Sequence, residues 1–191
     1  HVAVSGTTRY RSGWLNPEMI DNYFVTIFNT GKVQRVELQR DGASYTTTQR
    51  EFLTSLSKDF HPTDVLEDAD GSLLVIDTGG WFRIGCPTSQ IAKPEIAGGI
   101  YRVRRKGSPS FLDPWGKNIN WSAATPRQLG TLLNDTRFKV RERAITEFVR
   151  RGDAVVPTLE GVLRRGDIRA RNGAIWALCR IGTDPARAAI R

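Results

Sequence analysis

The sequence predicts a mixed fold, with β-strands in the first half and α-helices in the second. Short runs of β-branched and aromatic residues recur at roughly ten-residue spacing before residue 105, and Gly-containing turns separate them. After residue 125, a helical pattern repeats at an offset of 30 residues. These two observations predict β-structure over 1–106, a linker over 107–124 and paired helices over 125–191.

The distribution of charge supports two domains. Residues 1–100 carry 9 Lys and Arg against 12 Asp and Glu, a net charge of −3, whereas residues 101–191 carry 19 against 8, a net charge of +11. Such a shift predicts two domains with different surfaces. The chain has no apolar run of about 18 residues, so the sequence predicts no transmembrane segment.

The two cysteines indicate neither a metal site nor a haem site. Cys86 and Cys179 belong to no C-x-x-C or Cys/His cluster, so the sequence lacks a zinc-finger signature and a c-type haem attachment motif. We expect two unpaired, mostly buried thiols.

The chain begins without a Met or a signal peptide and stops within a helical pattern. We therefore expect it to be an internal piece of a longer protein.

The first predicted strands form a meander. Residues 22–29 are rich in aromatic and β-branched residues, and 33–38 alternate between apolar and polar side chains. Asp41-Gly42 is a hairpin signal, and residues 43–48 follow it as the next strand. The sequence thus predicts three strands joined by short turns.

A second group of strands follows at the same spacing of roughly ten residues. We expect strands over 63–67, 72–77 and 98–104, with a tight turn at 68–71. In this turn, Asp68 and Asp70 do not have the full spacing of a calcium loop, so we predict no metal site. The spacing of these short strands and tight turns favours the four-stranded blades of a β-propeller over a β-sandwich.

The second half begins with helix signals. Residues 108–116 contain two prolines and form a linker that we expect Phe111 and Trp115 to anchor. Thr125 is a good N-cap and Pro126 suits the first helical position. An apolar stripe follows, made of Leu129, Leu132 and Leu133.

An internal repeat indicates a helical solenoid. Residues 140–152 align with 170–182, so that Ala144 matches Ala174 and each segment ends at a Gly. In the same alignment Ile145 matches Ile175, Phe148 matches Leu178 and Arg141 matches Arg171. A second amphipathic helix is expected over 154–163. Two helices in each period of this length are typical of HEAT repeats, and the array here is incomplete.

The run FHPTDVLEDADGSLLVIDTGGWFRIGCPTSQ, followed by GGIYRVRR, carries a family resemblance over roughly residues 10–105. It resembles the closing blades of the propeller of quinoprotein sugar dehydrogenases, and more closely the large secreted bacterial proteins labelled membrane-bound dehydrogenases. In that family HEAT repeats follow the propeller. The resemblance implies a periplasmic or exported protein, a sugar-like substrate, and PQQ or a c-type haem held outside this chain.

Four residues of the first half are candidates for ligand binding: His61, Asp64, Trp81 and Arg83. His61 and Asp64 would lie on the strand that faces a propeller channel, where they either contact a ligand or cap a turn. Gly79-Gly80 permits a sharp bend that presents Trp81 and Arg83. Cys86 has no neighbouring His or Cys in the sequence to activate it, and no catalytic residue is assigned.

The second half contains candidates for a basic surface, represented by Arg141, Arg143, Arg151 and Arg171. They could bind phosphate or an acidic partner, or they could pair with Glu142 and Glu147 on a solvated helix face. The sequence interleaves no base-stacking aromatic residues with them, so nucleic acid is the least favoured partner.

Three functions follow from this interpretation. The first is a piece of an exported dehydrogenase-like protein that oxidises sugars or related alcohols, with its redox chemistry outside this segment. The second is a non-catalytic scaffold whose propeller and HEAT solenoid bind other proteins. The third is a basic HEAT module for nucleic acid. An enzymatic activity rests on the resemblance alone.

Overall fold

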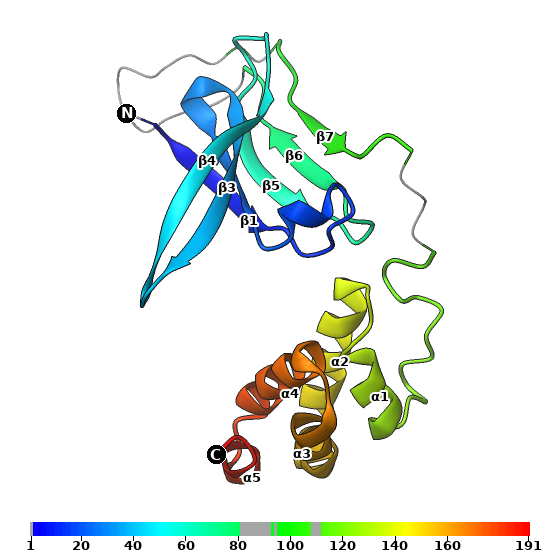
Figure 1. Cartoon of the computed structure of the whole chain (residues 1–191). Coiled ribbons are helices and arrows are strands. Elements are labelled where there is room, and N and C mark those ends of the chain that lie inside the picture. The colour runs from blue at the N-terminus through cyan, green and yellow to red at the C-terminus, as the bar shows by residue number, and fades with distance from the viewer. Residues whose placement is uncertain (1, 81–92, 94, 108–111) are drawn as a thin grey trace. The chain divides into compact units, whose positions relative to one another are not determined.

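The computed structural model describes residues 2–80, 93, 95–107 and 112–191 (Figure 1). The chain divides into two compact units, His1–Ser110 and Phe111–Arg191, here called the strand unit and the helical unit. Among the described residues, every strand lies in the first unit and every α-helix in the second. The predicted mixed class, β and then α, is therefore confirmed.

The strand unit begins with a four-stranded antiparallel sheet in which neighbours in sequence are neighbours in space. Its strands are β1 (Val4–Arg9), β2 (Tyr23–Ile27), β3 (Lys32–Asp41) and β4 (Ser44–Thr54). The sequence predicted three of them and missed β1. Its residues are mostly small and polar, so β1 has no apolar alternation to reveal it.

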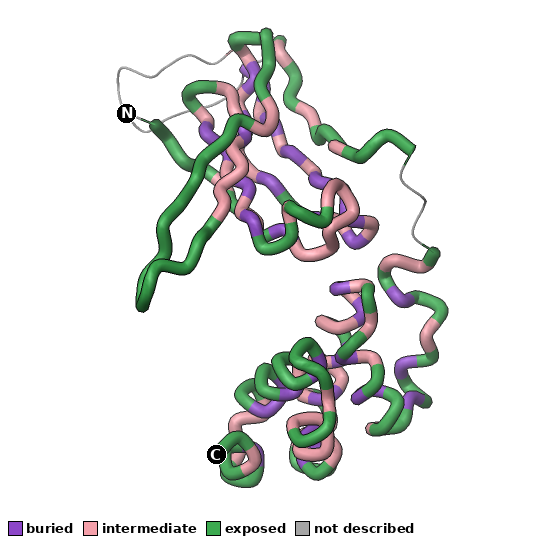
Figure 2. The backbone as a smooth tube through the Cα atoms, viewed as in Figure 1, coloured by how far each residue is buried: buried purple, intermediate pink, exposed green. Residues whose placement is uncertain are grey.

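The β3–β4 hairpin is longer than predicted. Asp41 pairs with Ser44 across a two-residue loop, and its first residue, Gly42, has a φ of 58°, a loop position at which hairpins favour glycine. The outer part of the hairpin, residues 38–51, is exposed along both strands (Figure 2). Its polar residues pair through backbone hydrogen bonds without a buried face, so their side-chain pattern could not reveal the full strand length.

A three-stranded antiparallel sheet follows, made of β5 (Pro62–Glu67), β6 (Leu73–Asp77) and β7 (Gly99–Val103). The turn between β5 and β6 is the one that the sequence predicted. In it, the Asp70 carboxylate accepts hydrogen bonds from the amide and hydroxyl of Ser72, and Gly71 has a φ of 77°. Arg102 of β7 and Arg104, just after this strand, pair with the aspartates of this turn.

The two sheets meet where β1 passes β5. The hydroxyl of Ser5 donates to the carbonyl of Pro62 at 2.9 Å. Gly6 lies so close to Asp64 that a Cβ there would be 2.4 Å from its Oδ1 atom, so only glycine fits. The apolar core of the unit draws on both sheets: Tyr10, Phe24, Val33, Phe60, Val65, Leu73 and Val75.

The helical unit contains α1 (Pro126–Leu132), α2 (Phe138–Arg151), α3 (Val156–Arg165), α4 (Ile168–Ile181) and α5 (Asp184–Ala188). Thr125 caps α1 through a complete capping box, and Pro126 is its first residue, as predicted. The part of the predicted second helix before Val156 is a 3-10 turn over Gly152–Val155.

The 30-residue repeat is confirmed at the level of helices. Helices α2 and α4 each have 14 residues, begin 30 positions apart and end at Gly152 and Gly182. Ala144 and Ala174 are both fully buried. The correspondence weakens outside the core, because Ile145 is partly buried and its counterpart Ile175 is exposed.

The expected linker packs on the helical unit. Trp121 is buried in its core, and its ring nitrogen donates to the carbonyl of Gly116 at 2.8 Å. Arg137 at the start of α2 donates to the carbonyl of Asp113 at 2.9 Å. Trp115, the expected anchor, is 47% exposed, and Phe111 lies outside the described residues. The residue that anchors this segment is instead Trp121, because its ring is buried in the core of the helical unit.

Two further expectations concern exposure and membrane crossing. Cys179 was expected to be buried but is exposed, because it lies on the side of α4 opposite Ala174 and Leu178. Cys86 lies outside the described residues. Among the helices that the structure describes, none has the length and apolar character needed to cross a membrane.

Candidate functional site

His61 joins the two sheets at the start of β5. Its Nδ1 atom is 2.6 Å from the carbonyl of Gly79 and 3.0 Å from that of Asp59. Both carbonyls can only accept, so this nitrogen is the protonated one. The ring also packs against Phe28, with ring centroids 5.0 Å apart. His61 therefore fills the turn-capping role that the sequence interpretation weighed against ligand binding.

Asp64 lies where β1 and β5 approach each other. Its Oδ1 atom accepts a hydrogen bond from the backbone amide of Val65 at 2.8 Å, and Gly6 of β1 lies against it. The side chain is partly buried. Its position indicates a role in joining the sheets.

A groove of about 320 Å³ opens beside His61 at this end of the second sheet. Carboxylates, hydroxyls and aromatic rings line it together with small apolar groups. The lining residues are Leu53, Thr54, Ser55, Ser57, Asp59, Phe60, Asp77, Ile96, Ala97 and Tyr101.

Asp77 organises this groove. It is buried, and its Oδ1 atom accepts from the amides of His61 and Gly79, each at 2.8 Å. Tyr101 approaches the other carboxylate oxygen at 3.4 Å, while Asp59 forms a 2.6 Å ion pair with Lys93. Tyr101 is half-exposed and presents a ring and a hydroxyl to solvent. The groove can therefore accept hydrogen bonds and provide a stacking surface for a small polar ligand.

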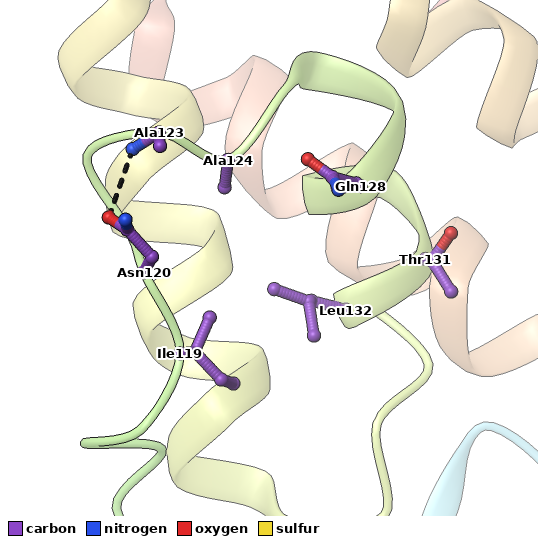
Figure 3. Close-up of a pocket in the computed structure, with 7 residues that line it drawn as sticks. All are labelled: Ile119, Asn120, Ala123, Ala124, Gln128, Thr131 and Leu132. Carbon is purple, nitrogen blue, oxygen red and sulfur yellow. Dashed lines mark hydrogen bonds between the residues drawn. The ribbon is translucent and has the colours of Figure 1, made fainter.

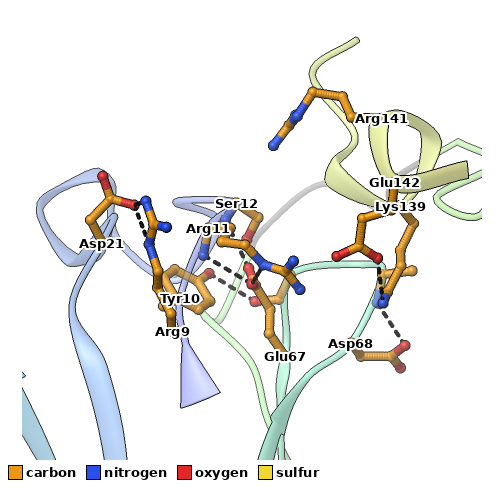
Figure 4. Close-up of polar contacts among 12 residues, drawn as sticks. Arg9, Tyr10, Arg11, Ser12, Asp21, Glu67, Asp68, Lys139, Arg141 and Glu142 are labelled. Atoms are coloured by element: carbon orange, nitrogen blue, oxygen red, sulfur yellow. Dashed lines mark hydrogen bonds and ion pairs between the residues drawn. The ribbon is translucent and has the colours of Figure 1, made fainter. Parts of the chain in front are cut away.

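A buried polar network that the sequence did not reveal lies at the other end of β5 (Figure 4). Glu67 accepts hydrogen bonds from the backbone amides of Arg11 and Ser12 at 2.9 and 2.8 Å. It also forms an ion pair with the side chain of Arg11. The hydroxyl of Tyr10 donates to the carbonyl of Gly71, and burial raises the pKa of Tyr10. A single Glu in an alternating strand carries no signal that it is buried.

The other candidates of the first half lie outside the described residues. Trp81 and Arg83 belong to this group, together with Cys86. Among the described residues, no cluster of three or more His, Cys, Asp or Glu side chains is arranged to hold a metal ion.

Three of the four candidate arginines contact other parts of the helical unit. Arg143 stacks on the ring of Trp121 at 4.6 Å, and Arg151 donates to the backbone carbonyl of Trp121 at 3.3 Å. Arg141 donates to the carbonyls of Asp135 and Thr136 at 2.6 and 3.0 Å. These three hold the loops before α2 and before α1 in place.

Arg171 occupies the same repeat position as Arg141 in a different environment. Its side chain is exposed, and no hydrogen bond or ion pair of this side chain is present among the described residues. The loop before α4 differs from that before α2, because Gly166 and Asp167 replace Thr136 and Arg137. Arg171 is therefore an exposed surface cation, unlike its repeat counterpart Arg141.

Two hollows mark the surface of the helical unit. The smaller, of about 420 Å³, lies between residues 119–124 and α1, and its lining is largely apolar (Figure 3). The larger is a groove of about 780 Å³ between α1 and α3 that reaches the start of α4. Its lining residues are Arg127, Gly130, Thr131, Asn134, Pro157, Thr158, Gly161, Val162, Arg165, Gly166, Asp167 and Ala170.

Comparison with known proteins adds a family for the strand unit. The model of a domain of unknown function, DUF7133, matches residues 1–107. The chain belongs to this family. No curated protein matches the chain, and no solved structure matches it.

The DUF7133 match spans both sheets and ends before the described part of the helical unit. It includes His61, Asp64 and the groove around Asp77. The groove between α1 and α3 lies outside it. The two grooves therefore belong to separate parts of the chain, and each needs its own functional argument.

Proposed function

We propose that the helical unit is a protein-binding module and that this chain acts as a scaffold. The groove between α1 and α3 carries the proposal. At about 780 Å³ it is large enough for several side chains of a partner, and a repeated helical pair forms its rigid walls. Short HEAT-type arrays bind proteins through surfaces of this kind.

The contacts of the predicted site residues support this proposal. His61 is held by two backbone carbonyls, and Arg143 and Arg151 are held by Trp121. These contacts are of the kind that stabilise a fold. The surface features that remain are grooves and exposed cations.

The groove floor provides the test. Gly161 faces the groove, and a Cβ there would meet only the flexible end of Arg165, at 3.3 Å. Gly161→Leu should therefore fill the groove while favouring the helix. A photo-crosslinking residue at Thr158 should capture a protein in the source cell, whereas the same residue at the exposed position Arg180 serves as the control.

The captured protein is identified by mass spectrometry, purified and titrated against the chain. We expect Gly161→Leu to weaken its binding by at least about tenfold, which corresponds to about 1.4 kcal/mol. Equal capture from Thr158 and Arg180, or unchanged binding by Gly161→Leu, would remove the support for a binding groove.

The groove beside Asp77 favours a second candidate function, the dehydrogenase-like role that the family resemblance implies. Asp59, Asp77 and Tyr101 combine carboxylate acceptors with an exposed ring, which suits a sugar or related alcohol. Two features support a propeller: a four-stranded meander is the unit of a blade, and the first strands of the two sheets lie together at Gly6 and Asp64.

In this second proposal the protein is exported and the redox group, PQQ or a c-type haem, is held outside this chain. No reaction step is assigned to the residues of this chain. Titration with glucose and glycerol tests the groove. Asp59→Asn and Tyr101→Ala should abolish a heat of binding that Glu51→Gln on the exposed hairpin leaves unchanged, and the absence of any heat with the unaltered chain would argue against a sugar site.

A further inference from the structure

The floor of the α1–α3 groove consists of small and apolar groups. A Cβ on Gly130 of α1 would lie 3.2 Å from the side chain of Val162 on α3, so the glycine allows the two helices to approach closely. Gly161 adds no side chain to this part of α3, where the nearest group is the end of the Arg165 side chain, and Thr158 and Pro157 continue the wall. This floor can accept apolar side chains of a bound segment.

Two arginines flank this floor. Arg127 lies in the first turn of α1, and Arg165 is the last residue of α3. Both are exposed. Among the described residues, neither guanidinium has an ion pair or a hydrogen bond. Arg165 lies back over Gly161, because its Nη2 atom is the nearest group to a Cβ at that position.

The rest of the helical unit does not neutralise these arginines. The unit contains 15 Lys and Arg against 8 Asp and Glu. Six of the eight acidic groups already form ion pairs within the unit: Asp113, Asp135, Glu142, Glu147, Glu160 and Asp184. The other two accept hydrogen bonds, Asp153 from Thr183 and Asp167 from the amide of Ala170.

We infer that the α1–α3 groove binds an acidic peptide segment of a partner protein, with Arg127 and Arg165 taking its carboxylates. The inference rests on the proposed protein-binding function and adds the chemistry of the partner. Exposed arginines form bidentate pairs with carboxylates, and the apolar strip between them selects for a chain that alternates acidic and apolar residues.

The groove suits a protein better than a nucleic acid. None of the described residues that line it is aromatic, so bases would find no stacking surface among them. An acidic peptide can place one of its apolar side chains beside Thr158 and keep its carboxylates at the two arginines.

The experiment measures fluorescence anisotropy of the full chain with a fluorescein-labelled peptide of Glu, Leu and Ala that carries a Glu every third or fourth residue. The same peptide with Gln in place of every Glu is the neutral probe, and single-stranded oligo-dT is the nucleic-acid probe. The test variant is Arg127→Glu/Arg165→Glu. The matched control is Lys117→Glu/Arg180→Glu, which changes the net charge equally at exposed positions that do not line the groove.

We expect the acidic peptide to bind at least about tenfold more tightly than the Gln peptide and to weaken between about 50 and 200 mM NaCl. The groove variant should lose at least about tenfold in affinity, and the control variant less than about twofold. Circular dichroism of both variants establishes that the helices are retained.

Equal losses in the two variants would overturn the inference, because they would indicate attraction by net charge alone. Tighter binding of oligo-dT with the same dependence on Arg127 and Arg165 would replace the peptide with a nucleic acid. A protein that is captured by the crosslinking residue at Thr158 and binds the Arg127→Glu/Arg165→Glu variant as tightly as the unaltered chain would contradict the inference that the partner is acidic. This result would leave the proposed protein-binding function intact.

Discussion

The hydroxyl of Thr183 donates a hydrogen bond to the carboxylate of Asp153, and the two residues are 30 positions apart, which is the period of the repeat. Each follows the glycine that ends a 14-residue helix, Gly152 after α2 and Gly182 after α4. Equivalent positions of successive helix pairs are therefore joined directly. The same Thr183 side chain accepts a hydrogen bond from the amide of Ala186 and so caps α5.

Replacement of Thr183 by Ala should destabilise the helical unit. The change removes the N-cap of α5 and the bond to Asp153, for which about 1 kcal/mol in the free energy of unfolding is expected. Urea unfolding followed by circular dichroism at 222 nm measures this loss. Thr146→Ala on the exposed side of α2 is the control and should change stability by less than about 0.5 kcal/mol. Equal effects of the two substitutions would contradict a specific role for Thr183.

The arginines at the two equivalent repeat positions should behave differently. Arg141→Ala removes hydrogen bonds to the carbonyls of Asp135 and Thr136, so a loss of about 1–3 kcal/mol is expected. Arg171→Ala removes an exposed side chain, so a change within about 0.5 kcal/mol is expected. Similar values from chemical unfolding of the two variants would show that the repeat position, rather than the local contacts, sets the role of the arginine.

In the strand unit, Glu67 should contribute more to stability than a surface glutamate. Its side chain is fully buried, and its two oxygens accept hydrogen bonds from the amides of Arg11 and Ser12. Glu67→Gln places an NH2 donor opposite one of these amide donors, so the free energy of unfolding should fall by about 1–3 kcal/mol. Glu51→Gln breaks only the exposed pair with Lys32 and should cost less than about 1 kcal/mol. Thermal unfolding followed by near-UV circular dichroism compares the two. The prediction fails if Glu67→Gln unfolds at the same temperature as Glu51→Gln.

The helical unit should lose stability in acid through Asp135. Partial burial acts to raise the pKa of Asp135, but the hydrogen bonds and positive charge of Arg137 outweigh it, so its pKa lies below the ordinary value. A carboxylate with a lowered pKa stabilises the fold above the unfolded pKa of about 3.9, and this contribution is lost as the pH falls through the lower folded pKa.

Asp135→Asn tests this contribution. The variant should be less stable than the unaltered chain at neutral pH, and the difference should shrink as the pH falls below about 4. Urea unfolding at a series of pH values measures the difference. A gap that stays constant down to the lowest pH would mean that the charge of Asp135 does not stabilise the fold.

Much of the fold could be predicted because its signals are local. The Asp-Gly turn at 41–42, the capping box at Thr125 and the matched helices that end at Gly152 and Gly182 depend on residues close together in the sequence. By contrast, β1 was missed, because its small and polar residues show no apolar alternation and only its pairing with β2 makes it a strand. The position of Trp121 in the core of the helical unit also depends on a distant element, α2.

The candidate sites could be predicted much less well. The sequence left open whether His61 binds a ligand or caps a turn, and whether Arg143 belongs to a basic surface. Their contacts, with the carbonyl of Gly79 and the ring of Trp121, join residues that are distant in sequence. The α1–α3 groove left no motif, because helix packing brings together its lining residues from separate parts of the sequence.

The sequence by itself therefore determined the order of strands and helices, the turns and the 30-residue period, because backbone propensity, capping and periodicity act within a few residues. Only the tertiary structure decided which polar side chains support the fold and which, like Arg127 and Arg165, remain available to a partner. The physical reason is that burial and hydrogen-bond partnership are properties of the packed chain: Arg141 and Arg171 share a repeat position, and their different surroundings alone separate a structural contact from a free charge.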